Sequence, residues 1–167
     1  MRQQTKTPKI LIIIDLLALL GLGTAFLLVQ FYAPVEQEMG IVQKVFYFHV
    51  AAAWTGMLGF TVATIAAIVY LRTSNPRWDV AGVSGVEIGM VFMAIAIISG
   101  SIWARPIWNT LWTWDPRLTT TLVMELLYAA YFLLRSGVDD HTRRARYAAV
   151  YAIAGFASVP LTFISIR

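Results

Sequence analysis

The sequence has no cysteine and few charged residues. The lack of cysteine excludes disulfides, thiolate catalysis, cysteine-type zinc sites and iron–sulfur clusters. Only 13% of the 167 residues are charged and 59% are hydrophobic, whereas soluble domains are about 25% charged and about 45–50% apolar. With a mean hydropathy of +0.69, this composition argues against a soluble enzyme, a nucleic-acid-binding domain or a disordered linker. The expected solvent is the membrane.

Five apolar segments are long enough to cross a bilayer, because a membrane-spanning helix needs about 20 mostly apolar residues. The predicted spans cover residues 10–32, 44–71, 86–103, 118–134 and 147–166. The first apolar run is longer than a signal-peptide core and no small-x-small cleavage site follows it, so we expect a retained signal anchor. We therefore predict an all-α fold, a polytopic transmembrane helical bundle that forms a single membrane domain over residues 1–167.

The lysine and arginine residues indicate how the spans are oriented. With the N-terminus in the cytoplasm, nine of the 13 lie on the cytoplasmic side: Arg2, Lys6, Lys9, Arg72, Arg77, Arg135, Arg143, Arg144 and Arg146. The other four lie on the outer side: Lys44, Arg105, Arg117 and Arg167. The positive-inside rule favours this orientation, which places the connections 33–43 and 104–117 outside.

A tryptophan-rich segment follows the third predicted span. Four of the six tryptophans lie in it: Trp103, Trp108, Trp112 and Trp114. Trp108 and Trp112 are four residues apart and would share one face of a helix. An aromatic belt at the membrane interface is one interpretation. The density of tryptophan favours another, a short amphipathic helix on the outer face that offers a platform to a flat apolar ligand.

Charged residues flank the tryptophans on both sides. Asp115 and Pro116 interrupt the pattern, and Asp115 is predicted to cap a helix that begins near Arg117 or Leu118. Arg105 and Arg117 lie on either side of the segment, and guanidinium groups pair well with carboxylates, including those of ligands.

His49 lies at the outer end of the second predicted span. Aromatic residues 46–48 precede it and small residues 51–53 follow it, which leaves room for a ligand to approach. Neutral imidazole is a common axial ligand of haem iron, although a histidine at a helix end is often only an interface residue. His141, the other histidine, falls on the cytoplasmic side, about 30 Å away across the hydrocarbon. We therefore expect His141 to be a solvated loop residue that cannot share an iron with His49.

Three carboxylates lie inside or at the edge of predicted spans. Asp15 and Glu87 are near cytoplasmic ends and can reach water, whereas Glu125 is about two turns into the fourth span. Carboxylates within a membrane are functional candidates by default, and we expect Glu125 to pair with a polar group on a neighbouring helix. The sequence shows no metal-ligand cluster, glycine-rich phosphate loop or nucleophile–base pair.

The order of three motifs, KVFYFHVAAAW, GSIW and WTWDPRLTT, resembles that of the haem-handling proteins of cytochrome c maturation with the tryptophan-rich WWD signature, most closely their CcmC type. The resemblance covers nearly the whole chain. It implies that haem b is held at the outer face of the bacterial cytoplasmic membrane, between the tryptophan-rich loop and two histidines. His49 matches the first histidine and the iron ligand. The residues that match the signature are Trp103, Trp108, Trp112, Trp114, Asp115 and Arg117.

The same resemblance implies six spans, with the second histidine in the outer loop after the fifth. Because this sequence stops at Arg167, we expect a truncated member that holds the tryptophan platform and one axial ligand. Arg105 and Arg117 would hold the haem propionates. The protein would bind and hand over haem rather than act as a conventional enzyme. A haem chaperone of the CcmE type and subunits of an ABC-type transporter are implied as partners.

Two other functions fit the composition. The chain would be a structural membrane subunit if its tryptophans served only as interface anchors. It would be a transporter of another solute if Glu125 were a coupling residue.

Overall fold

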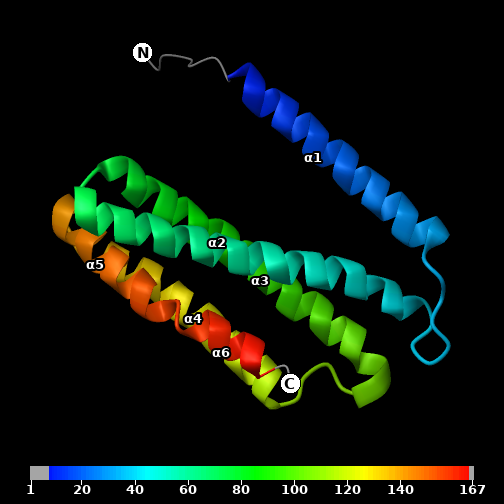
Figure 1. Cartoon of the computed structure of the whole chain (residues 1–167). Coiled ribbons are helices and arrows are strands. Elements are labelled where there is room, and N and C mark those ends of the chain that lie inside the picture. Colours follow the sequence, from blue (N-terminus) through cyan, green and yellow to red (C-terminus); the bar gives the residue numbers. More distant parts are fainter. Residues whose placement is uncertain (1–7, 166–167) are drawn as a thin grey trace. The chain divides into compact units, whose positions relative to one another are not determined.

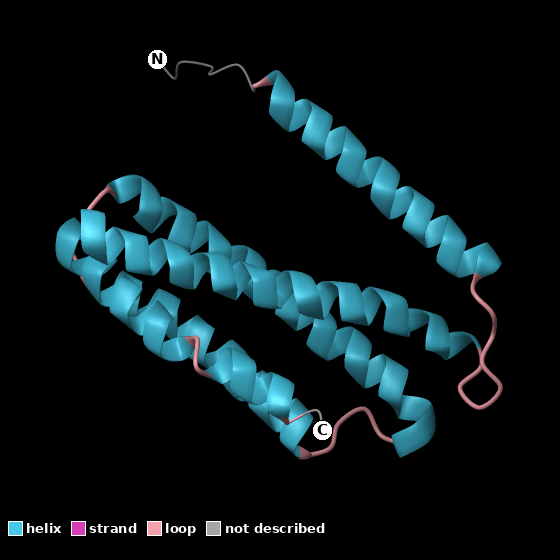
Figure 2. Ribbon diagram, in the orientation of Figure 1, coloured by secondary structure: helices cyan, strands magenta, loops and turns pink. Residues whose placement is uncertain are grey.

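The computed structural model describes residues 8–165, which are almost entirely helical (Figures 1 and 2). The α-helices are α1 (Lys9–Leu27), α2 (Val45–Thr73), α3 (Pro76–Trp108), α4 (Pro116–Ser136), α5 (His141–Gly155) and α6 (Ser158–Ile164). A π-helical turn, η1 (Leu28–Tyr32), extends α1, and a 3₁₀ turn, η2 (Ile41–Lys44), precedes α2. Arg2, Lys6, Ile166 and Arg167, which entered the predictions of orientation and of the fifth span, lie outside the described residues.

Within residues 8–165, five helical segments are long and apolar enough to cross a membrane, as the sequence predicts. They are Lys9–Tyr32, Ile41–Thr73, Pro76–Trp108, Pro116–Ser136 and His141–Ile164. The all-α multi-span fold is therefore confirmed. The third segment begins at Pro76 rather than at residue 86 because Asn75 caps it, accepting a hydrogen bond from the Arg77 amide at 3.0 Å, and Pro76 suits the first helical position.

The chain divides into two compact units, Met1–Lys44 and Val45–Arg167. In the first unit, α1 carries apolar side chains on all sides apart from Asp15, which is the pattern of a helix surrounded by lipid. A tight turn follows, in which Glu36 and Gly40 form an isolated antiparallel bridge and Gly40 adopts a φ of 60°.

In the second unit, α2 and α3 pack against each other through glycine. A Cβ atom added to Gly59 would lie 2.8 Å from the carbonyl oxygen of Gly85, and one added to Gly85 would lie 2.9 Å from the Ala63 amide nitrogen. Such close approach of two backbones is the usual way in which membrane helices associate, since no water drives them together. Helix α4 joins this pair through Tyr128, whose ring stacks on the buried Phe60 with centroids 3.7 Å apart.

The predicted fifth span is two helices in the structure, α5 and α6. They are separated at Phe156 and Ala157, four and three residues before Pro160. Proline has no amide hydrogen for the carbonyl four residues earlier and its ring clashes with that carbonyl. The Phe156 carbonyl instead accepts a bond from the Val159 amide at 3.0 Å. The end of α6 lies beside the start of α4 (Figure 1), where the hydroxyls of Thr120 and Ser165 are 2.9 Å apart.

The tryptophan-rich segment differs from the expected separate amphipathic helix. Its first half, with Trp103 and Trp108, is the last part of α3. That helix ends at Asn109, which adopts a left-handed φ of 51°. The second half, with Trp112 and Trp114, is an irregular connection to α4. Trp108 and Trp112 therefore do not share a helix face, because the helix ends between them at the left-handed residue Asn109.

Candidate functional site

A pocket of about 450 Å³ lies at one end of the second unit. Its wall is formed by the start of α2, the end of α3, the start of α4 and the end of α6. Its volume is within the range of about 300–1,000 Å³ that small-molecule and cofactor sites occupy. Most of the wall is apolar, and its polar side chains include His49, Arg117 and Thr121.

The imidazole of His49 is held by the backbone of the neighbouring helix. Its Nδ1 atom is 2.9 Å from the carbonyl oxygen of Ala96 in α3. A carbonyl oxygen can only accept a hydrogen bond, so Nδ1 carries the hydrogen and donates it. In neutral imidazole, Nε2 then keeps its lone pair. Metal-binding histidines commonly have this arrangement, in which the second nitrogen donates to a carbonyl and orients the ring.

An aromatic ring and a glycine flank this imidazole on α3. Trp103 lies nearly parallel to His49, with an interplanar angle of 15° and ring centroids 6.1 Å apart. Phe46 contacts the same indole, with centroids 4.9 Å apart. Gly100 is buried directly against the imidazole, since a Cβ atom there would lie 2.8 Å from Cε1 of His49.

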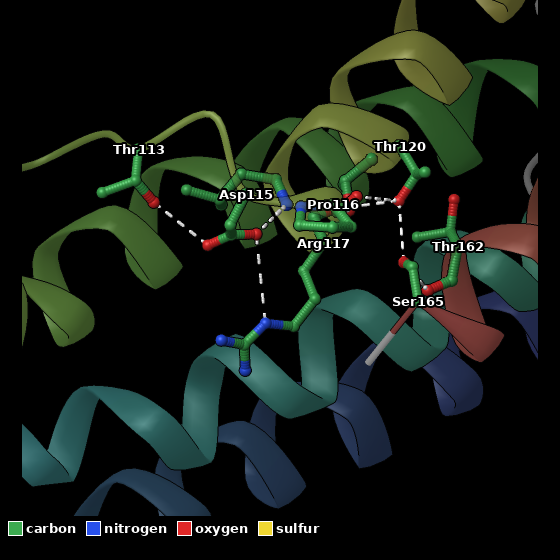
Figure 3. Close-up of polar contacts among 9 residues, drawn as sticks. Thr113, Asp115, Pro116, Arg117, Thr120, Thr162 and Ser165 are labelled. Atoms are coloured by element: carbon green, nitrogen blue, oxygen red, sulfur yellow. Dashed lines mark hydrogen bonds and ion pairs between the residues drawn. The ribbon is translucent and has the colours of Figure 1, made fainter. Parts of the chain in front are cut away.

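The start of α4 brings a cation to the same pocket. Arg117 lines the wall, and its guanidinium carbon is 5.6 Å from the ring centroid of Trp108, which also lines the pocket. Arg117 Nε is 3.9 Å from Oδ1 of Asp115 (Figure 3). The guanidinium is thus oriented by an indole face and a carboxylate, while its side chain remains half exposed.

Asp115 caps α4, as the sequence predicts. Its Oδ1 accepts a hydrogen bond from the Leu118 amide and its Oδ2 accepts one from the Thr113 hydroxyl, both at 3.0 Å (Figure 3). Partial burial of the Asp115 carboxyl favours its protonated form, but these hydrogen bonds and the nearby Arg117 charge favour the carboxylate more strongly. The pKa of Asp115 is therefore held below its usual value. Asp115 positions the start of α4 and does not itself line the pocket.

Besides Asp115, three of the predicted site residues lie away from the pocket wall. Trp112 and Trp114 contact each other edge to face, with ring centroids 5.6 Å apart, and Trp114 is 75% exposed. Arg105 is exposed on the last turns of α3. The structure thus brings together His49, Trp103, Trp108 and Arg117, and leaves Arg105, Trp112, Trp114 and Asp115 outside the pocket.

The other predicted polar residues lie apart from this site. His141 begins α5, just beyond the far end of α4, where it is exposed and contacts Arg144. Glu125 is half-buried in α4, but within the described part of the chain its Oε2 atom has no hydrogen-bond partner, contrary to the expected pairing. Residues 8–165 contain no group of three or more histidine, aspartate or glutamate side chains placed to hold a metal ion.

Sequence reasoning missed Ala96, Gly100 and Phe163. Phe163 in α6 lines the pocket and contacts Trp54 of α2, with ring centroids 5.7 Å apart. The sequence does contain a pattern that marks the α3 residues. Small residues recur at positions 96, 100 and 104, which lie on one face of a helix. The sequence alone did not show that this face receives an imidazole.

Together, the fold and the site define a multi-pass helical membrane protein with a ligand-sized pocket at one end of its bundle. Comparison with known proteins specifies the family. The model of the family described as "CcmC: Heme exporter protein C" matches residues 2–167, and the chain therefore belongs to this family.

Curated relatives have the same description. The chain is 37% identical to Heme exporter protein C of Bradyrhizobium diazoefficiens over 134 residues, which is 80% of this chain and 51% of that protein. It is 34% identical to Heme exporter protein C of Rhodobacter capsulatus over 125 residues, 75% of this chain and 52% of the relative. It is 32% identical to that of Escherichia coli K12 over 136 residues, 81% of this chain and 56% of the relative. The chain thus spans about half the length of the curated relatives it matches. With five candidate spans and these bacterial relatives, it is a multi-pass inner-membrane protein.

Proposed function

We propose that this chain takes part in cytochrome c maturation by binding haem in the pocket beside His49 and presenting it at the outer face of the membrane. Membership of the Heme exporter protein C family supports the haem assignment. The single structural observation that carries it is the His49–Ala96 hydrogen bond of 2.9 Å, which leaves Nε2 as a ligand atom on a residue of the pocket wall.

The residues of the pocket fit the chemistry of haem. We propose haem b, bound without a covalent link, since this sequence offers no cysteine for one. His49 would be an axial ligand of the iron through Nε2. Trp103 and Trp108 would contact the flat macrocycle, and Arg117 would pair with a propionate. Arg105, which is exposed on the same end of α3, is the candidate for the second propionate.

The exposed half of the tryptophan segment has a different proposed role. Trp112 and Trp114 extend from the connection that Asp115 ties to α4, and Trp114 is largely exposed. A largely exposed indole paired with the half-buried Trp112 suits contact with a haem chaperone of the CcmE type during handover. Subunits of an ABC-type transporter are the other proposed partners.

The proposed orientation has the N-terminus in the cytoplasm and the pocket on the outer side. Within the second unit, Arg72 and Arg77 lie at the α2–α3 connection, and Arg135 and Arg143 lie at the α4–α5 connection. Both connections are at the opposite ends of their helices from the pocket. This separation of positive charge supports the orientation.

The experiment that tests the proposal compares His49→Ala with its matched control, His141→Ala. Titrating the purified protein with haem should give an absorbance band that scales with wild-type protein. His49→Ala should lose or strongly shift that band, and added imidazole should partly restore it, because free imidazole can occupy the vacated position. The control should behave as wild type, since His141 is exposed at the other end of the helices. An unchanged spectrum of His49→Ala excludes His49 as the ligand.

One observation favours the alternative of a transporter for another solute. Glu125 is half-buried, and its buried Oε2 atom has no hydrogen-bond partner among the described residues. Such groups within membranes often mark ion or proton pathways. Glu125 does not line the pocket. Proton flux across vesicles that contain the wild-type protein, lost in Glu125→Gln while haem binding is unchanged, would support the transporter function. Wild-type vesicles without such flux would oppose it.

A further inference from the structure

We propose that Gly100 is a positioning residue that seats the His49 imidazole, so that the Ala96 carbonyl holds Nδ1 and leaves Nε2 free for a ligand. This inference rests on the proposed role of His49. The same arrangement is expected in the protein without haem. The surface of α3 that receives the imidazole, here called the seat, is made by contacts of α2 with α3 alone.

The seat is one face of α3. Ala96, Gly100 and Trp103 are spaced i, i+4 and i+7, which places them along one side of the helix. The first supplies a backbone acceptor 2.9 Å from Nδ1 of His49. The third supplies an indole nearly parallel to the imidazole. Between them, Gly100 supplies an empty space into which the ring fits.

The space left by the missing side chain of Gly100 lies against the edge of the His49 ring that carries the hydrogen-bonded Nδ1. A Cβ atom at position 100 would lie 2.8 Å from Cε1, 3.0 Å from Nδ1 and 3.7 Å from Nε2 of His49. These three are the nearest atoms, and all belong to His49. A methyl group here would therefore collide with the Nδ1 edge and leave Nε2 in ordinary contact.

Separating the two helices to relieve such a collision would break their close packing. A Cβ atom at Gly59 would lie 2.8 Å from backbone atoms of Gly85 and Gly89, so the α2 and α3 backbones are in contact further along. The imidazole must instead rotate away from α3. Rotation lengthens the Nδ1 to Ala96 bond, and neither the tautomer nor the direction of Nε2 remains fixed.

A first experiment examines the seat without haem. This chain has two histidines, so residues 1–167 labelled with ¹⁵N-histidine give two sets of ring signals, with His141 as an internal reference. Wild type should show His49 with a protonated Nδ1 and an unprotonated Nε2. Gly100→Ala should lose this single tautomer. The matched control is Gly82→Ala in the same helix, where a Cβ atom meets only ordinary contacts at 3.8 and 3.9 Å, and it should retain the wild-type signals. An unchanged tautomer in Gly100→Ala overturns the proposal.

A second experiment measures haem binding. Loss of a residue that orients a metal ligand commonly weakens binding by about 10- to 100-fold, and we expect a decrease of this size in Gly100→Ala, partly reversed by imidazole. Loss of haem binding in His49→Ala with unchanged binding in Gly100→Ala would reject the positioning role of Gly100 and leave the proposed role of His49 standing. Unchanged binding in His49→Ala would reject the proposed function, and the tautomer measurement would still decide the seat.

A double variant covers the case in which Gly100→Ala does not fold. Because a Cβ atom at position 100 meets His49 first, the double variant with His49→Ala should be as stable to thermal unfolding as His49→Ala alone. Such non-additivity is the signature of a direct contact between the two sites. A double variant less stable than His49→Ala would show that position 100 excludes a side chain for another reason.

Discussion

At the scale of single residues, Asp115 links the tryptophan-rich connection to the pocket. One carboxylate oxygen caps α4 through the Leu118 amide, and the other accepts the Thr113 hydroxyl. The same carboxylate lies 3.9 Å from the Arg117 side chain that lines the pocket. A change at Asp115 therefore affects the start of a helix and the orientation of a pocket residue together.

Replacing Asp115 tests both roles. Asp115→Ala should lower the free energy of unfolding by about 0.5–2 kcal/mol, because the Leu118 amide loses its acceptor. Asp115→Asn keeps an oxygen in the cap and should lose less. Thermal unfolding in detergent, followed by circular dichroism, measures both. Equal losses in the two variants would contradict a capping role.

The lowered pKa of Asp115 predicts how the stability difference between wild type and Asp115→Asn changes with pH. The pKa of Asp115 is lower in the folded chain than its usual value, so the carboxylate contributes stability above the pKa of the unfolded state. That contribution is lost as the pH falls through the folded-state pKa. The stability difference between wild type and Asp115→Asn should therefore be constant near neutral pH and shrink below about pH 4. A difference that grows on acidification would be inconsistent with the lowered pKa.

The tryptophans divide into two groups with different expected effects. Trp108 lines the pocket, and its replacement by alanine should weaken haem retention by about 2- to 10-fold, the equivalent of one aromatic contact of about 0.5–1.5 kcal/mol. Trp114 is exposed outside the pocket, so Trp114→Ala should retain haem and lose handover to the chaperone. Haem titration and transfer assays on the two variants measure the difference. Equal loss of retention in both would mean that the exposed indoles also hold the ligand.

At the scale of helices, the glycines of α2 and α3 set how closely these helices pack. The contacts at Gly59 and Gly85 involve backbone atoms on both sides, which cannot move as a flexible side chain can. The aromatic pair of Phe60 and Tyr128 then brings α4 against them. The position of His49 relative to Ala96 depends on this spacing, because they lie on different helices.

Gly85→Ala should therefore be costly. Its Cβ atom would lie 2.9 Å from the Ala63 amide nitrogen and from the Gly59 carbonyl oxygen, and overpacking of this kind costs about 1–3 kcal/mol. We expect a lower melting temperature in detergent and a weakened His49–Ala96 contact. The control Gly155→Ala, where a Cβ atom meets nothing within 4 Å, should melt as wild type. A wild-type melting temperature in Gly85→Ala would show that α2 and α3 can separate freely.

At the scale of the whole molecule, the second unit has two chemically different ends. The pocket end carries His49, Trp108 and Arg117. The other end carries the connections from α2 to α3 and from α4 to α5, where Asp79 and Arg135 form a two-point ion pair at 2.7 and 3.0 Å. The proposed orientation places the first end outside and the second in the cytoplasm.

Cysteine labelling tests this orientation cleanly, because the chain has no native cysteine. Thr110→Cys in the tryptophan-rich connection should react with a membrane-impermeant thiol reagent in intact spheroplasts, and Thr142→Cys only after lysis. Position 110 is preferable to the neighbouring Asn109, whose left-handed φ of 51° a cysteine would strain. The reverse labelling pattern would place the pocket on the cytoplasmic side.

Features that depend on residues close together in the chain follow from the amino-acid sequence alone. Hydropathy determined the five spans, because about 20 apolar residues in a row have few other stable environments. Local chemistry determined the Asp115 cap, since the carboxylate and the Leu118 amide are three residues apart. The motif order also indicated the family that the comparison shows.

Only the tertiary structure decided which of these residues meet. Hydropathy and helical periodicity do not specify how one helix is set against another, and His49 and Ala96 are 47 residues apart on different helices. The choice of Nδ1 as donor and the empty space at Gly100 follow from that interhelical packing. So does the division between tryptophans that line the pocket and tryptophans that lie outside it. Even the end of α3 at Asn109, which separates these two groups, depends on a left-handed backbone conformation that the tryptophan spacing did not predict.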